Sequence, residues 1–381
     1  MKKILLIMGV IILSNIGFAD AKADYTNAES LAKSNKIAES VKLLESVSNS
    51  GDKTYAIKAN FQLGAYHLQN NNLINAKKYL GLVWNDTNNN APEKDEAARL
   101  LYTIALSEKK VSEAQKYIEW ADNKSGADDV DTTSGLIIFY FENNMQTKGD
   151  TRYNTAMKST NTEYKSEVNY NIGQYYLSKN NTVQAKKYLQ SSYNMSPVAI
   201  IPAGYLLSQI EVNSNNPAGA EKILLDMNTK TGNKDIEALM MLGSYYLQNN
   251  NAAKAEEYLK KASSINTKDV DTRVLLLGLY EVQNNTSKIN SIYNELKAIV
   301  PAKELNKNLG VAFANLGNGN LAEKYLKRAI SEDKDNQAKL SLGQVYALVG
   351  KKNEAITILK EAVNNKVQGA SELLKQVEAI K

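Results

Sequence analysis

Apolar residues recur every three or four positions along the chain, in segments of about helical length joined by short polar turns. A small residue stands at the centre of many first segments, and an alanine often follows it twelve positions later in the second segment. The unit repeats at intervals of 32 to 38 residues, which predicts about ten helical hairpins. The central positions are Thr26, Gly64, Tyr102, Ile137, Gly173, Ser208, Gly243, Gly278, Gly310 and Gly343. The alanines are Ala38, Ala76, Ala114, Ala185, Ala220, Ala255, Ala322 and Ala355.

Five of the central residues are glycines, although a glycine inside a helix costs roughly 1 kcal/mol relative to alanine. A close approach of the two helices would compensate for that cost, so we expect each glycine to face the alanine twelve residues later. Asparagine-rich turns such as Asn70–Asn72 and Asn249–Asn251 separate the two helices. Asparagine and glycine tolerate the left-handed backbone that ends a helix, so these clusters predict tight turns.

The repeated unit resembles the tetratricopeptide repeat, a helical hairpin of 34 residues. The similarity covers about residues 24–365, although most units lack the repeat-end proline that Pro197 provides and all lack the first-helix tryptophan. It implies an all-α, right-handed superhelical solenoid of about ten hairpins with a C-terminal capping helix. Leu63, Ile172, Leu242, Leu309 and Leu342 match the leucine of the first helix, and Tyr176, Tyr246, Phe313 and Tyr346 match its aromatic position.

The repeats predict one elongated domain over residues 22–365. Packing should be irregular near residues 123–157, because Gly149 stands there in place of the alanine. Asn290 takes the alanine position after Gly278, so that second helix should be shifted by one residue. Residues 366–381 predict a capping helix, with Leu373, Leu374, Val377 and Ile380 on one face.

The first 21 residues have the layout of a secretory signal peptide. Lys2 and Lys3 precede an apolar run from Ile4 to Leu13, and Ala19 and Ala21 form a cleavage site. We therefore expect an exported protein, periplasmic or secreted, that is not inserted in a membrane. The cut is expected after Ala21, and cuts after Ala19 or Ala23 fit nearly as well. An uncleaved N-terminal anchor is the alternative. The absence of cysteine suits export and excludes thiol chemistry.

The sequence predicts no enzyme, no cofactor and no metal site. His67 is the only histidine and stands at an aromatic packing position, and Asp128, Asp129 and Asp131 lack the spacing of a calcium loop. They are expected to start a helix or to lie in a solvated linker. The net charge of +5 is spread evenly, without the basic stripe that nucleic acids need.

The resemblance implies that first-helix residues three before, one after and four after the central position line a concave groove. The uncharged character of this stripe favours an apolar peptide or a helix of another protein. Two functions stay open: a scaffold or adaptor of the bacterial cell envelope that binds a partner in the groove, or a structural subunit of an envelope assembly that uses its ends and convex face. The predicted groove residues are Phe61, Leu68, Tyr170, Gln174, Leu177, Tyr205, Gln209, Met240, Ser244, Leu247, Leu275 and Leu279.

Overall fold

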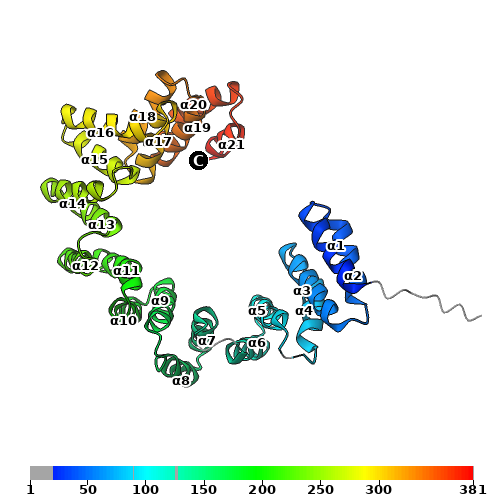
Figure 1. The fold of residues 1–381 in the computed structure, drawn as a ribbon. Coiled ribbons are helices and arrows are strands. Elements are labelled where there is room, and N and C mark those ends of the chain that lie inside the picture. The colour runs from blue at the N-terminus through cyan, green and yellow to red at the C-terminus, as the bar shows by residue number, and fades with distance from the viewer. Residues whose placement is uncertain (1–19, 89, 125–127, 381) are drawn as a thin grey trace, which may run out of the picture. The chain divides into compact units, whose positions relative to one another are not determined.

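The computed structural model describes residues 20–88, 90–124 and 128–380. Within these ranges every regular element is a helix, which confirms the all-α prediction. Twenty of the helices pair into ten successive hairpins, and one more helix follows the last hairpin (Figure 1). The chain divides into two compact units, Met1–Ser196 and Pro197–Lys381, and the division falls at the proline that the repeat pattern places at a repeat end.

The first unit contains five hairpins. They are α1 (Ala21–Lys33) with α2 (Ile37–Ser48), α3 (Lys53–Gln69) with α4 (Leu73–Asn85), α5 (Pro92–Ser107) with α6 (Val111–Lys124), α7 (Val130–Glu142) with α8 (Gln146–Ala156), and α9 (Thr162–Ser178) with α10 (Thr182–Met195).

The second unit opens with a short 3-10 helix, η1 (Pro197–Ala199), and contains the other five hairpins. They are α11 (Ile200–Asn213) with α12 (Pro217–Lys230), α13 (Ile236–Gln248) with α14 (Ala252–Ile265), α15 (Val270–Val282) with α16 (Thr286–Ile299), α17 (Ala302–Asn315) with α18 (Gly319–Ser331), and α19 (Gln337–Leu348) with α20 (Lys352–Asn364). Helix α21 (Ala370–Ala379) comes last.

Each hairpin turn contains one residue with left-handed backbone, as the asparagine-rich turns predicted. In the α3–α4 turn this residue is Asn71, with φ of 57°. The next residue, Asn72, caps α4, since its side chain accepts a hydrogen bond of 3.2 Å from the Asn75 backbone N–H. The two asparagines therefore have different roles, one ending a helix and the other starting the next. The left-handed residues are Asn35, Asn71, Lys109, Asn144, Asn180, Asn215, Asn250, Asn284, Gly317 and Gly350.

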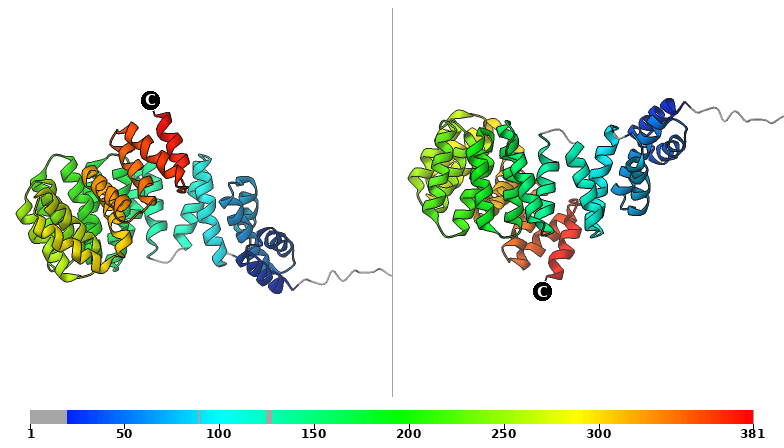
Figure 2. Two further views of the ribbon diagram at one scale, coloured as in Figure 1. Left: turned by 90° about the horizontal axis from the view of Figure 1, so that it is seen from above. Right: turned by 90° about the horizontal axis from the view of Figure 1, so that it is seen from below.

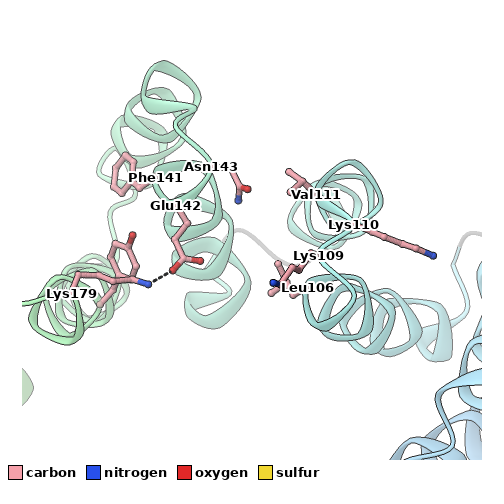
Figure 3. Close-up of a pocket in the computed structure, with 9 residues that line it drawn as sticks. Leu106, Lys109, Lys110, Val111, Phe141, Glu142, Asn143 and Lys179 are labelled. Atoms are coloured by element: carbon pink, nitrogen blue, oxygen red, sulfur yellow. Dashed lines mark ion pairs between the residues drawn. The ribbon is translucent and has the colours of Figure 1, made fainter.

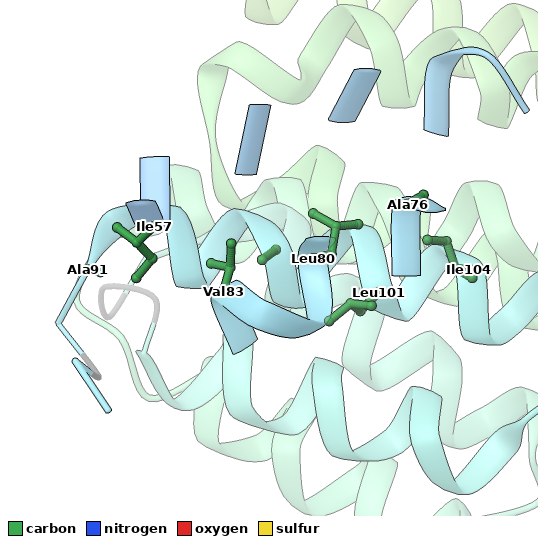
Figure 4. Close-up of a cluster of buried hydrophobic side chains, with 8 residues drawn as sticks. Ile57, Ala76, Leu80, Val83, Ala91, Leu101 and Ile104 are labelled. Atoms are coloured by element: carbon green, nitrogen blue, oxygen red, sulfur yellow. The ribbon is translucent and has the colours of Figure 1, made fainter. Parts of the chain in front are cut away.

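The central glycines do bring two helices close together, but the side chain they accommodate differs from the prediction. A Cβ added to Gly64 would lie 2.6 Å from Leu80 Cγ and 3.2 Å from the Leu80 backbone nitrogen. The nearest atoms thus belong to a leucine sixteen residues later, whereas Ala76 was the expected neighbour. Figure 4 shows Leu80 and Ala76 in one buried cluster of the first unit. The same spacing recurs in Gly173 with Leu189, Gly243 with Leu259, Gly310 with Leu326 and Gly343 with Leu359.

The first hairpin has a different register from the predicted one. Thr26 and Ala38, the expected small pair, are both exposed. Ala28 and Ser40 are buried instead, and the Ser40 hydroxyl donates a 2.7 Å hydrogen bond to the Ala28 carbonyl. The prediction was wrong here because Thr26 and Ala38 satisfy the twelve-residue spacing without facing each other.

In the α7–α8 hairpin the large residue stands at the centre of the first helix and the glycine stands in the second helix. The central residue, Ile137, is large and fully buried, and the second helix supplies the glycine. Gly149 accommodates the ring of Phe141, which occupies the space where a Cβ would stand. The hairpin is therefore closely packed although its second helix has a glycine in place of the alanine.

Tyrosine, glutamate and lysine link successive hairpins. The Tyr246 hydroxyl in α13 donates a 2.6 Å hydrogen bond to Glu221 in α12, and Lys254 in α14 pairs with the same carboxylate at 3.0 Å. The pKa of Tyr246 is raised to about 12, mainly by burial and to a smaller extent by the hydrogen bond to Glu221. These tyrosines therefore serve packing between repeats, as the sequence indicated. The same trio occurs in Tyr140, Glu119 and Lys148; in Tyr280, Glu256 and Lys288; and in Tyr346, Glu323 and Lys351.

Both tryptophans lie in one aromatic cluster in the first unit. The Trp84 ring, in α4, meets Trp120 at 5.1 Å and Tyr117 at 5.0 Å between centroids, both edge-on. The Lys94 ammonium lies 5.8 Å from each tryptophan centroid. Burial lowers the pKa of Lys94, and the aromatic faces offer its cation partial compensation. The cluster joins α4, α5 and α6.

Helix α21 begins after Gly369, which has φ of 82°, and packs against α19 and α20 (Figure 2). Ala370 and Val377 are its buried residues. Ile380 was predicted on the same apolar face, but it lies beyond the end of the helix and is 51% exposed.

The predicted signal peptide lies outside the described residues, except for Asp20 and Ala21, which begin α1. In the part of the chain that is described, no helix has the length and apolar character needed to cross a membrane.

Candidate protein-binding groove

A groove of about 450 Å³ crosses α13, α15 and α17 in the second unit. All these helices are the first helices of their hairpins, the ones predicted to line a binding surface. Its apolar residues are Leu247, Ala252, Val274, Leu275, Gly278, Leu279, Val282, Phe313 and Leu316. Its polar residues are Ser244, Gln248, Asn250, Gln283 and Asn318.

Gly278 forms part of the groove because the α15–α16 hairpin has a shifted register. In the neighbouring hairpin the left-handed Asn250 comes seven residues after the central Gly243, whereas Asn284 comes only six after Gly278. The central place in α15 therefore belongs to Leu277, which is fully buried. The prediction that Gly278 is the central residue was wrong, although the predicted one-residue shift of this hairpin is present.

The shift leaves the groove without a side chain at one position. Gly278 stands one place after the central residue, where α13 has Ser244 and α17 has Val311. A Cβ on Gly278 would lie 3.1 Å from Phe313 Cε1. The missing side chain lets the Phe313 ring approach α15 closely, and both Gly278 and Phe313 line the groove.

The rim of the groove carries uncharged polar groups. The side chains of Ser244, Gln248, Asn250 and Gln283 make no hydrogen bond with any described residue. Asn318 uses its side-chain oxygen to accept a 3.1 Å hydrogen bond from the Leu321 N–H. No charged residue lines the groove. The site therefore offers an apolar floor and hydrogen-bonding groups that still lack partners in the protein.

The structure brings four of the predicted groove residues together in this groove: Ser244, Leu247, Leu275 and Leu279. Leu275 and Leu279 are only 9% and 4% exposed, so they contribute the floor and little free surface. Met240, Tyr205 and Gln209 belong to the same unit but do not line the groove.

Two of the five predicted residues of the first unit pack against a core cluster, and the other three lie on α9. Phe61 and Leu68 pack against a buried cluster of α3, α4 and α5. Figure 4 shows the residues of that cluster. Tyr170 accepts a 3.1 Å hydrogen bond from Gln174, one turn later on the same helix. Leu177 is partly buried near the end of α9.

The predicted stripe missed Phe313 and Leu316 because they stand three and six places after Gly310, whereas the stripe takes the positions three before, one after and four after the central residue. Leu316 is 54% exposed in the turn after α17, a site where Asn70 and Asn249 stand in more regular repeats. A leucine at a turn position that is polar in other repeats was the available signal.

A second pocket, of about 500 Å³, lies in the first unit between the α5–α6 turn, α7 and α9. Figure 3 shows Glu142 and Lys179 pointing toward each other, with an ion pair of 2.9 Å, whereas Lys110 points away. Lys110 pairs instead with Glu108 at 3.1 Å. Three of the four charged residues that line this pocket therefore have partners, and no ion pair within the described residues involves the fourth, Lys109.

The residues considered for catalysis or metal binding have structural contacts. His67 stacks on Tyr79 with ring centroids 5.6 Å apart. Asp129 caps α7 by accepting a hydrogen bond from the Thr132 N–H, and Asp128 accepts one from Ser159, in agreement with the predicted helix start. Among the described residues, no three His, Cys, Asp or Glu side chains lie together in a way that could hold a metal ion.

A family model described as tetratricopeptide repeat matches residues 166–198, 236–269 and 306–336. These segments correspond to the hairpins α9–α10, α13–α14 and α17–α18. The chain carries tetratricopeptide repeats. The other hairpins share the turn geometry of the matched ones, and two of the three helices that line the groove belong to matched repeats. Proteins built of tetratricopeptide repeats are generally non-enzymatic interaction scaffolds, and they bind other proteins or peptides.

Solved structures similar to this chain have low sequence identity. The pilF protein of Pseudomonas aeruginosa is 14% identical, with 58% of this chain and 96% of that chain covered and a TM-score of 0.34. PilW, a type IV pilus biogenesis factor, is 13% identical, with 62% and 98% covered and a TM-score of 0.33. YrrB, a repeat protein with an unusual peptide-binding site, is 18% identical, with 49% and 94% covered and a TM-score of 0.33. The comparison with curated proteins gives no match.

Proposed function

We propose that this protein is a non-enzymatic scaffold or adaptor of the bacterial cell envelope, which holds a segment of a partner protein in the groove of α13, α15 and α17. The observation that carries the proposal is the lining of this groove. Leu247, Val282 and Leu316 present aliphatic surface beside hydrogen-bonding groups that have no partner in the protein. Exposed apolar surface rimmed by polar groups is typical of a protein-binding site.

The location in the cell envelope is supported by the N-terminal sequence. Lys2 and Lys3 precede an apolar run and a small-residue cleavage site, and the chain has no cysteine. After export the mature chain would begin near Lys22 and meet its partner beyond the cytoplasmic membrane.

A second function, as a structural subunit of an envelope assembly, is favoured by two exposed residues of the first unit. Ile74 and Val183 stand at equivalent places near the start of the second helices α4 and α10, and they are 81% and 77% exposed. Exposed aliphatic groups at equivalent places in two repeats suit a contact along the second helices of the hairpins.

Site-specific photo-crosslinking in cells tests both functions. A photoreactive amino acid at Val282, which is 72% exposed in the groove, should capture a partner protein, and the same group at Val183 should not. Two sites of matched chemistry and exposure thus report on different surfaces. Capture from Val183 alone would contradict binding in the groove and support the assembly subunit.

A further inference from the structure

The chemistry of the groove restricts its occupant, provided that the groove is the binding site proposed above. No acidic or basic side chain lines it. The nearby carboxylate of Glu281 is already occupied, since it accepts hydrogen bonds of 2.6 Å from both Lys324 and Tyr325. A charged ligand group would lose hydration without gaining a partner, which is strongly unfavourable. The segment that enters is therefore uncharged.

The free polar groups indicate the conformation of the occupant. Gln248, Asn250 and Gln283 come from two successive turn regions and have no side-chain hydrogen bond with any described residue. Each amide can both donate and accept. An extended peptide presents unpaired backbone N–H and C=O groups along its length, whereas a helix satisfies these groups internally except at its ends. Free amides beside an apolar floor therefore suit an extended ligand.

The apolar surface continues past the groove to the next hairpin. A Cβ on Gly319 would lie 3.0 Å from Val349 Cγ1, so Val349 reaches the α17–α18 turn that holds Leu316. Val349 and Leu348 are 50% and 84% exposed. More regular repeats have polar residues at these positions, such as Ser178 and Lys179 after α9.

The length of this surface sets the length of the segment. Neighbouring first helices from α13 to α19 are in contact, and packed helices lie about 8 to 10 Å apart. Three such steps span roughly 24 to 30 Å, which an extended chain covers with about seven to nine residues at about 3.3 Å each. We infer that the groove holds an extended, uncharged segment of about seven to nine residues with apolar side chains, contributed by a partner protein.

Selection from a library of random displayed peptides, about twelve residues long, tests this inference on the full chain. Peptides that also bind the double variant Val282→Gln, Leu316→Gln are removed first. The enriched peptides should have uncharged, apolar cores. A synthetic peptide from the selection should bind at least about tenfold more weakly to Val282→Gln, and equally well to the matched control Val183→Gln.

Two further measurements separate an extended ligand from a helical one. Gln248→Ala combined with Gln283→Ala should weaken the peptide about tenfold, because the backbone of the ligand loses its partners. The same peptide with helix-enforcing α-aminoisobutyrate at alternate positions should lose binding. Three results would each overturn this inference and leave the groove as a binding site. They are enrichment of peptides with charged cores, unchanged affinity for the Gln248→Ala, Gln283→Ala variant, and retained binding of the helix-enforced peptide. If the selection gave no peptide that distinguished the wild type from the groove variant, the proposed function itself would fail.

Discussion

The contact between Gly64 and Leu80 can be tested with two glycines of the same hairpin. Gly81 lies in α4, next to Leu80, and a Cβ added there would meet nothing within 4 Å. Gly81→Ala should therefore stabilise the protein by about 1 kcal/mol through helix propensity alone. A Cβ on Gly64 would lie 2.6 Å and 2.7 Å from two Leu80 side-chain atoms and 3.2 Å from its backbone nitrogen.

The expected effect of Gly64→Ala is the difference between two terms. The new methyl group gains the same ~1 kcal/mol of helix propensity, but overpacking against a neighbour costs about 1 to 3 kcal/mol. Rotation of the Leu80 side chain cannot relieve the contact fully, since a backbone atom also lies close. The variant should thus lose up to about 2 kcal/mol, and the two alanine variants should differ by about 1 to 3 kcal/mol.

Urea denaturation followed by far-ultraviolet circular dichroism measures this difference as a change in midpoint. Leu80→Ala supplies the control, because it removes the two side-chain atoms nearest to the new methyl group and leaves only the backbone nitrogen at 3.2 Å. In that background Gly64→Ala should become neutral or stabilising by up to about 1 kcal/mol. Equal stabilisation by Gly64→Ala and Gly81→Ala in the wild-type background would refute the idea that the glycines are required for close packing.

Three further outcomes are expected. Asn251→Ala should lower the free energy of unfolding, measured by urea titration, by about 1 kcal/mol, because the Asn251 side chain caps α14 by accepting a hydrogen bond from the Lys254 N–H. An unchanged free energy would contradict the capping role of this turn asparagine. Burial raises the pKa of Glu256, but hydrogen bonds from Lys260, Lys288 and Tyr280 outweigh it and hold the pKa at about 2, below the usual 4.5. A depressed carboxylate pKa stabilises the fold above about pH 4.5, and this stability is lost as the pH falls toward about 2. The melting temperature of Glu256→Gln should therefore change less with pH over this window than that of the wild type. An equal pH dependence in both proteins would count against the ion-pair link. Intact-mass analysis of exported protein should find a chain without residues 1–21, whereas a full-length, membrane-associated chain would support the uncleaved anchor.

The hairpins could be predicted because their signal is both local and repeated. Small residues at regular spacing, followed by asparagine turns, defined the number of hairpins and most of their boundaries. The register failed at Thr26 and at Gly278, where a small residue met the spacing by coincidence. The left-handed turn residues, Asn35 and Asn284, mark the true register, because their backbone geometry determines where each helix must end.

The groove was harder to predict, since it depends on contacts between repeats. Spacing on a single helix placed Phe61 and Ser244 on the same stripe, yet the first packs into a core and the second lines the groove. The side chains of the neighbouring hairpin decide which of these occurs. Gly278 lines the groove because of the one-residue shift in its hairpin. Asn290 indicated that shift, but the spacing assigned it to the second helix and left Gly278 at the central position, and only the left-handed Asn284 places the shift in α15.

The aromatic cluster makes the two units distinguishable by spectroscopy. Trp84 and Trp120 are the only tryptophans in the chain, and both lie in the first unit. Tryptophan emission therefore reports on the helices α4 to α6, while the second unit, with the groove, contributes no tryptophan signal. Far-ultraviolet circular dichroism detects the helices of both units. Denaturation curves recorded by the two methods will coincide only if the units unfold together, so the unmodified chain already carries a reporter for whether the groove melts independently of the N-terminal repeats.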